Sequence, residues 1–156
     1  LDHGSEFTVR LPRAAAPQLG HGQSARPQAA PPSSRILVVD DNIDSADSLA
    51  LLLRLRGHEA HALHDGRAAL ETAPHLSPHL ILLDIGLPEM DGYEVATRLR
   101  ALPELAGTIV VAMTGYGQPE DRVRSRAAGF HHHLVKPVDI RTVESLLWPA
   151  AAETPL

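Results

Sequence analysis

Acidic, hydroxyl and ammonium side chains follow the apolar runs of this sequence at several points. Asp40 and Asp41 close one run, Asp84 closes another, and Thr114 and Lys136 each follow a later one. Carboxylates that lie close together repel one another, and a divalent cation such as Mg²⁺, a hard ion that takes oxygen ligands, relieves the repulsion. A carboxylate can also accept a phosphoryl group, in a transfer that depends on positioning and charge neutralisation. These residue types indicate phosphoryl chemistry, provided that the fold brings them together.

The apolar runs themselves predict the strands of a mainly parallel sheet. Residues 36–40, 80–84 and 108–113 are nearly continuous in Val, Ile and Leu, as expected of strands covered on both faces. Residues 59–63 and 132–135 are less apolar, which suits strands nearer the sheet edges. Amphipathic stretches alternate with these runs, as in repeated βα units. We therefore expect an α/β fold with a doubly wound, five-stranded parallel sheet in the order 2-1-3-4-5.

Helical spacing and the usual end signals predict five helices between the strands. The expected helices end at Gly57, run from Asp65 to about Ala73 before Pro74, cover about 92–102, run from Pro119 to Gly129, and begin at Asp139. In open sheets of this kind, ligands bind beyond the carboxyl ends of the strands, where the strand order reverses. The polar residues introduced above should gather at that edge.

The sequence resembles the receiver domains of bacterial response regulators and hybrid histidine kinases. The resemblance covers about 35–148 and is carried by Val38-Val39-Asp40-Asp41, by Leu82 to Gly92, by Met113-Thr114-Gly115 and by Val135-Lys136-Pro137. It implies a flavodoxin-like (βα)5 receiver domain over residues 35–149 that takes a phosphoryl group on Asp84 from a phosphohistidine. The implied partner is a histidine kinase or a phosphotransfer domain, with receiver–receiver contacts as a further possibility.

The resemblance also implies Mg²⁺ as the cofactor and a set of ligands for it. Asp41 and Asp84 are the expected direct ligands, Asp40 acts through water, and the backbone carbonyl of Gly86 is a further ligand.

The phosphoryl group itself is expected to contact the remaining polar residues of the site. Lys136 neutralises one phosphoryl oxygen, the Thr114 hydroxyl donates to another, and Gly115 leaves the approach open. A cis peptide bond before Pro137 would allow the tight turn that directs Lys136 into the site.

His133 departs from the family pattern, because receivers usually carry Tyr or Phe three residues before the lysine. In receivers this residue fills the space behind the threonine after phosphorylation, so we expect Thr114 and His133 to form the switch. If the ring moves from solvent into that space, its desolvation should favour the neutral form. The run His131-His132-His133 does not favour a transition-metal site, because alternate residues of a strand point to opposite faces.

Composition limits the classes of function. The 156 residues suffice for one domain and a tail, with 44% hydrophobic and 21% charged residues. A formal net charge of −5 argues against nucleic-acid binding by this domain. Without cysteine there is no disulfide or thiolate metal site. No apolar run is long enough to cross a bilayer, so we expect a cytoplasmic chain without membrane contact.

The residues before the domain predict a longer parent protein. Residues 14–34, rich in Ala, Pro, Gln and Ser, are expected to form a disordered linker, and residues 150–156 a flexible tail. Residues 1–13 are interpreted as the last strand of a truncated ATP-binding domain of a histidine kinase, which makes the parent a hybrid histidine kinase. In the other interpretation, Gly4 to Phe7 is a cloning scar.

Alternatives to a phosphorelay receiver within a hybrid kinase remain open at this level. One is a stand-alone single-domain response regulator. Another is a Mg²⁺-dependent phosphatase with an Asp nucleophile, although such enzymes usually carry a second Asp where Gly86 lies. A pseudo-receiver that only binds partners would not need the complete set of acidic and basic residues. A flavin-binding protein is disfavoured by an aromatic content of 3%.

Overall fold

The computed structural model describes residues 33–115 and 124–147, which form a parallel sheet flanked by helices. The sheet has five strands in the order β2-β1-β3-β4-β5, and every neighbouring pair is parallel. The strands are β1 (Arg35–Val39), β2 (Glu59–Leu63), β3 (Leu80–Asp84), β4 (Ile109–Thr114) and β5 (His132–Val135). The predicted fold class and strand order are confirmed, and the strand limits agree to within a residue.

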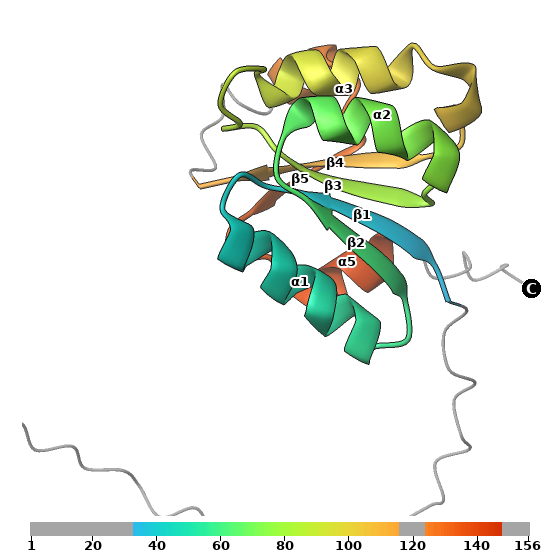
Figure 1. Ribbon diagram of the computed structural model, residues 1–156, viewed down its shortest axis with the longest axis vertical. Coiled ribbons are helices and arrows are strands. Elements are labelled where there is room, and N and C mark those ends of the chain that lie inside the picture. Colours follow the sequence, from blue (N-terminus) through green and yellow to red (C-terminus); the bar gives the residue numbers. More distant parts are fainter. Residues whose placement is uncertain (1–32, 116–123, 148–156) are drawn as a thin grey trace, which may run out of the picture. The chain divides into compact units, whose positions relative to one another are not determined.

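Helices cover both faces of this sheet (Figure 1). One face carries α1 (Ile43–Leu55) and α5 (Ile140–Leu147), and the other carries α2 (Gly66–Leu76) and α3 (Gly92–Arg100). A 3-10 turn, η1 (Pro103–Leu105), follows α3, and residues 124–127 are also helical. Within the described residues, no helix combines the length and apolar character needed to span a membrane.

Alternation along the central strands divides the core into two layers. Ile36 and Val38 of β1 pack in the cluster that contains α1 and α5 residues, whereas Leu37 and Val39 pack with α2 and α3. All four side chains are fully buried. Because the central strands are covered on both faces, their sequences are continuously apolar rather than alternating.

Side-chain caps fix where the helices begin. The Asp65 carboxylate accepts a hydrogen bond from the Ala68 amide at 2.7 Å, as predicted for the start of α2. Asn42 and Asp91 act in the same way ahead of α1 and α3. After α1, Gly57 takes a φ of +93°, a conformation that favours glycine.

Two helix limits differ from the sequence predictions. The α2 helix runs through Pro74 and ends at Leu76, and the next residue, Ser77, has a left-handed φ of +47°. Helical hydrogen bonding continues past the proline, because the Ser77 amide donates to the Ala73 carbonyl at 2.9 Å. The third helix ends at Arg100, two residues early, and the chain then re-forms as the 3-10 turn.

Several sequence predictions fall partly or wholly outside the described residues. These are the N-terminal strand (1–13), the C-terminal tail (150–156), most of the linker (14–34) and the start of the helix expected at Pro119. At the end of that helix, Gly129 has the expected positive φ, +89°. Ser34, assigned to the linker, is buried, and its carbonyl accepts a hydrogen bond from the Glu59 amide at 2.9 Å. The folded region therefore includes Ser34.

Candidate functional site

Strand register brings the polar residues that follow the apolar runs to one edge of the sheet. Val39 of β1 pairs with Leu83 of β3, so the next residues, Asp40 and Asp84, lie side by side at the strand ends. Asp84 pairs in turn with Met113 of β4, which Thr114 follows. Thr114 pairs with Val135 of β5, which Lys136 follows. The strands thus place these side chains where the strand order reverses, between β1 and β3.

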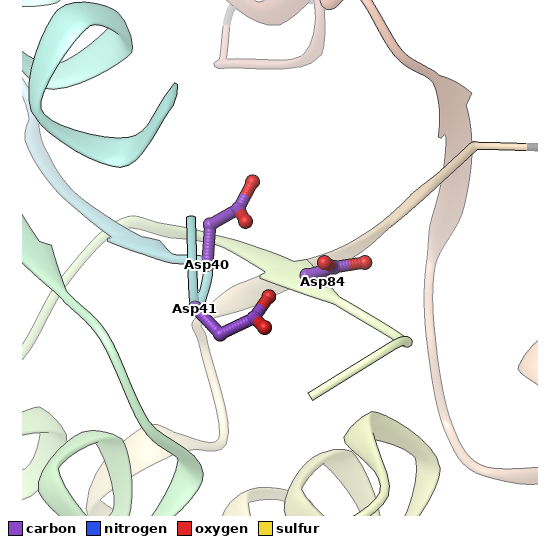
Figure 2. Close-up of side chains that lie close together, drawn as sticks. All are labelled: Asp40, Asp41 and Asp84. Atoms are coloured by element: carbon purple, nitrogen blue, oxygen red, sulfur yellow. The ribbon is translucent and has the colours of Figure 1, made fainter. Parts of the chain in front are cut away.

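The three acidic residues form a tight cluster. Carboxylate oxygens of Asp40, Asp41 and Asp84 all lie within 4.8 Å of one another. Figure 2 shows Asp40 and Asp41 projecting from the loop after β1 toward Asp84 at the end of β3. Asp40 and Asp84 are buried, at 1% and 7% exposure, whereas Asp41 is exposed. In the described part of the chain this is the one cluster of three acidic or His side chains with metal-binding spacing.

Lys136 lies between two of these acids. Its Nζ atom is 2.7 Å from Oδ2 of Asp40 and 2.8 Å from Oδ2 of Asp84. Burial by itself lowers the pKa of Lys136, but the hydrogen bonds and charges of the two carboxylates outweigh it, so the pKa is raised overall. Lys136 therefore supplies a fixed positive charge at the site throughout the physiological pH range.

Backbone and hydroxyl donors orient the carboxylates further. Oδ1 of Asp84 accepts a hydrogen bond from the Gly86 amide at 3.1 Å. Oδ1 of Asp40 accepts one from the Asn42 amide at 3.0 Å, and its Oδ2 accepts one from the Ser45 hydroxyl at 3.2 Å. Asn42 and Ser45 were not among the predicted site residues. The polar run directly after Asp41 is a recognisable helix start, and it could have indicated both residues.

Two glycines at the site have opposite surroundings. A Cβ atom on Gly92 would lie 2.3 Å from the Asp84 carbonyl oxygen and 2.6 Å from the Ile85 Cα atom. Only glycine therefore lets the start of α3 pack on the backbone that carries Asp84. A Cβ on Gly115 would meet no atom within 4 Å, consistent with an open approach at that position.

His133 does not lie in solvent. Its ring is half-buried, with Nε2 at 3.0 Å from Oγ1 of Thr114 and Nδ1 at 3.4 Å from Oγ of Ser125. The condition considered above, a ring that starts in solvent and moves inward on phosphorylation, is therefore not met in this structure. Ser125 escaped the sequence analysis because it meets His133 only through helix packing, which leaves no sequence signal.

The neighbouring histidines do not assemble into a metal site. Nδ1 of His131 accepts a hydrogen bond from the Val110 amide at 2.9 Å, and His132 is exposed. Burial, followed by the charge of Arg100, lowers the pKa of His131.

The Lys136–Pro137 peptide bond is cis, as predicted.

The donor set of the acid cluster fits a magnesium ion. Three carboxylates in close contact provide hard oxygen donors, and two of them are shielded from water, which raises the cost of leaving their mutual repulsion unrelieved. With no cysteine in the chain and no His in the cluster, the softer ligands that favour transition metals are lacking at this site.

The fold and its acidic edge define a doubly wound α/β protein of the flavodoxin-like class. The response regulator receiver domain family matches residues 36–147, and the chain belongs to that family. It is thus a receiver domain of the type found in two-component systems.

The relatives include proteins of several kinds. An uncharacterised 14.6 kDa protein of Leptolyngbya boryana is 38% identical over 104 residues, which cover 67% of this chain and 79% of that protein. The transcriptional regulatory protein PrrA of Mycobacterium tuberculosis is 41% identical over 105 residues, covering 67% of this chain but only 44% of PrrA. The chain thus spans less than half of that regulator.

Solved receiver structures share the fold. The receiver domain of sensor histidine kinase PA1611 from Pseudomonas aeruginosa, with a magnesium ion coordinated in its active site cleft, is 28% identical, with a TM-score of 0.67. The match covers 74% of this chain and 94% of that one. A CheY-like receiver from Methanospirillum hungatei matches with the same coverage and TM-score at 29% identity.

Proposed function

We propose that this receiver accepts a phosphoryl group on Asp84 from a phosphohistidine and changes conformation in response. The observation that carries the proposal is the pairing of the Asp84 carboxylate with Lys136 inside a cluster of three acids. A buried carboxylate held at a strand end by a cation and a backbone amide is positioned as a nucleophile. The magnesium-containing receiver of PA1611 supports the same interpretation by similarity.

In the proposed transfer, an Asp84 carboxylate oxygen attacks phosphorus. The new O–P bond forms as the P–N bond of the phosphohistidine breaks, and the histidine ring leaves with the electron pair of that bond. Lys136 is already within hydrogen-bonding distance of Asp84 and would neutralise a phosphoryl oxygen. The hydroxyl of Thr114, buried at the end of β4, would donate a hydrogen bond to another phosphoryl oxygen. Hydrolysis of the acyl phosphate would restore the carboxylate.

The proposed Mg²⁺ would be held by Asp41 and Asp84 directly, by Asp40 through water and by the Gly86 carbonyl. When bound, it neutralises charge on the carboxylates and on the phosphoryl oxygens. Asp40 and Asp84 would then share Lys136 and the metal as counterions.

The proposed donor is a histidine kinase or a phosphotransfer domain. A groove of about 410 Å³ beside the site is lined by Asp40 and Lys136 and by apolar residues that include Leu49 and Leu52 of α1. Leu52 and, near the site, Ile43 are about half exposed, at 49% and 56%. Apolar side chains exposed next to a phosphoacceptor suit contact with a helical donor domain.

We further infer that the parent protein is a hybrid histidine kinase. The inference is supported by the resemblance of residues 4–12 to a kinase strand and by the similarity to the receiver of PA1611. The stand-alone regulator is the alternative. An upstream reading frame that encodes a dimerisation helix with a phosphoacceptor His would support the hybrid kinase, and its absence would favour the alternative.

Labelling with a small acyl-phosphate donor tests the phosphoacceptor directly. Intact mass spectrometry should show one added phosphoryl group in the presence of Mg²⁺ and none after chelation. Asp84→Asn should remain unlabelled. Asp47→Asn, a change of an exposed acid on α1, should be labelled like the parent chain, which here means the chain without substitutions. Labelling of Asp84→Asn at the parent rate would contradict the proposal.

A further inference from the structure

The His133 ring joins two buried hydroxyl groups on different elements. Thr114, at the end of β4, is 1% exposed, and Ser125, in the helical segment 124–127, is 3% exposed. Both ring nitrogens are used, Nε2 at 3.0 Å from Thr114 Oγ1 and Nδ1 at 3.4 Å from Ser125 Oγ. Phe at this position could make neither contact, and Tyr offers one hydroxyl in place of two ring nitrogens.

We propose that His133 is a positioning residue for the Thr114 hydroxyl, and that the protonation of its ring decides whether this hydroxyl can donate to a phosphoryl group on Asp84. The proposal rests on the proposed phosphoacceptor function. It assigns a regulatory role to a residue that departs from the family pattern.

The tautomers of the ring have different consequences for Thr114. If the proton is on Nδ1, then Nε2 can only accept, and the contact at 3.0 Å uses the Thr114 hydroxyl proton. If the proton is on Nε2, the ring donates to Oγ1, and the Thr114 proton is left for another acceptor. The imidazolium donates from both nitrogens, so it also leaves that proton available. Two of the three ring states therefore support donation to a phosphoryl oxygen.

The charged and titratable neighbours of His133 show which groups around the ring could also change charge with pH. A groove of about 300 Å³ beside the ring is lined by Arg126 of the helical segment and by His131 and His132. On the site side, the nearest charged residue along the chain is Lys136, which pairs with Asp40 and Asp84. The Thr114 contact from β4 is uncharged. The pKa of His131 is lowered, mainly by burial and then by the charge of Arg100, which favours the neutral form of that ring.

Phosphorylation should therefore select the ring states that hold a proton on Nε2. A phosphoryl group adds negative charge and requires donors, so the phosphorylated state favours the imidazolium over the neutral ring. By reciprocity, proton binding to His133 favours phosphorylation. The contribution is present at low pH and is lost as the pH rises through the titration of the ring. This direction is opposite to the sequence-based expectation, because the ring already lies inward before phosphorylation.

Paired substitutions test the proposal through a pH profile. The labelling rate of Asp84 with a small acyl-phosphate donor and Mg²⁺ would be measured between about pH 5 and 8, where histidine titrates. Each rate is divided by that of His133→Phe, which cancels the titration of the donor. The ratio for the parent chain should be about two to ten at the acidic end, the scale of one hydrogen bond, and should decline as the pH rises.

Two further variants separate positioning from a merely structural role. His133→Gln can donate to Thr114 but cannot titrate, so its ratio should stay above one and remain flat. In a Thr114→Ala background, His133→Phe should have no further effect, because the hydroxyl that His133 orients is gone. His132→Gln, a change on an exposed side chain, is the matched control and should follow the parent profile.

The outcomes distinguish this proposal from the phosphoacceptor function. If the parent chain is not labelled, or Asp84→Asn is labelled equally, the phosphoacceptor function fails. If Asp84 is labelled but the parent chain and His133→Phe have the same rate at every pH, only the role of His133 fails. An undiminished effect of His133→Phe in the Thr114→Ala background would also overturn it.

A measurement on the unaltered chain avoids any folding defect of the variants. Ring resonances of His133 would be titrated by NMR with and without beryllofluoride and Mg²⁺, which together stand in for the phosphoryl group. The titration midpoint should move to higher pH in the beryllofluoride-bound state. A midpoint that stays the same or moves to lower pH would overturn the proposal.

Discussion

Nζ of Lys136 lies 2.8 Å from Oδ2 of Asp84, the proposed phosphoacceptor. Lys136 is the only lysine in the sequence, so selective labelling of lysine reports on this one ammonium group. Because the carboxylates of Asp40 and Asp84 outweigh the effect of burial, its pKa is raised above the ordinary value. A ¹³C-lysine NMR titration should show this directly. Asp40→Asn should lower the pKa, and an unchanged value would mean that the contact at 2.7 Å does not persist in solution.

The same ammonium group should compete with Mg²⁺ for the carboxylates. Lys136→Met removes a positive charge next to two proposed ligands, and one unit charge at about 4 Å contributes roughly 1 to 4 kcal/mol. We therefore expect Lys136→Met to bind Mg²⁺ about tenfold more tightly by isothermal titration calorimetry, while its labelling by an acyl-phosphate donor falls. Asp41→Asn should weaken Mg²⁺ binding. Weaker binding in Lys136→Met would show that the lysine supports the metal site rather than competing with it.

Gly92 should be required for the geometry of Asp84. A Cβ atom at Gly92 would contact the Asp84 carbonyl oxygen and the Ile85 Cα atom, and backbone atoms cannot move aside as a flexible side chain can. We expect Gly92→Ala to lower the free energy of unfolding by about 1 to 3 kcal/mol, the usual cost of overpacking, and to slow labelling of Asp84.

Gly107 provides the matched control for this substitution. A Cβ at Gly107 would meet no atom within 4 Å. Gly107→Ala should therefore change stability by less than about 0.5 kcal/mol. Equal effects of the two substitutions in urea unfolding would contradict the steric explanation.

The sheet and its acidic edge could be predicted because the relevant signals are local in sequence. The stretches 36–39 and 80–83 are continuously apolar because helices cover both faces of the central strands. Once the strands are placed, parallel pairing brings the residues after them together. Asp40, Asp84 and Lys136 therefore meet as their positions in the sequence indicate.

Features that depend on packing between elements could not be predicted. The contact of His133 with Ser125 depends on how the helical segment lies over β5, which no periodicity reports. The α2 helix continues past Pro74, although proline usually ends a helix, and the Ser77 amide still donates to the Ala73 carbonyl. Both differences arise where tertiary structure overrides a local preference.

An ion pair joins the turn after α1 to α5. Arg56 donates two hydrogen bonds to Glu144, at 2.9 and 3.0 Å, and Nε2 of the buried His58 lies 3.6 Å from Oε1 of Glu144. The hydrogen bond from Arg56 is the main cause of the lowered pKa of Glu144. A lowered carboxyl pKa stabilises the fold above the unfolded-state value, and this stabilisation is lost as the pH falls through the folded-state value.

Glu144→Gln should therefore lower the melting temperature at neutral pH. The loss should be only a few degrees, because Arg56 is half exposed and water weakens the pair. The difference from the parent chain should disappear in acid. Glu94→Gln, which breaks an exposed pair with Arg98 within α3, should have a smaller effect at neutral pH. A Glu144→Gln deficit that persists unchanged at acid pH would show that the loss is one of packing rather than of charge.

The last prediction concerns the N-terminal limit of the folded region. Residues 14–32 are rich in Ala, Pro and Gln and have few large apolar side chains, so deletion of residues 1–32 should leave the melting temperature unchanged. Deletion of residues 1–35 should be clearly destabilising. It removes the Ser34 carbonyl that pairs with Glu59, and it removes the Arg35 guanidinium, which donates to the Leu76 and Ser77 carbonyls at 3.0 and 2.8 Å. Thermal unfolding of the two truncated chains beside the full chain decides the matter. A marked loss of stability on deletion of residues 1–32 would mean that the segment before Ser33 packs on the receiver.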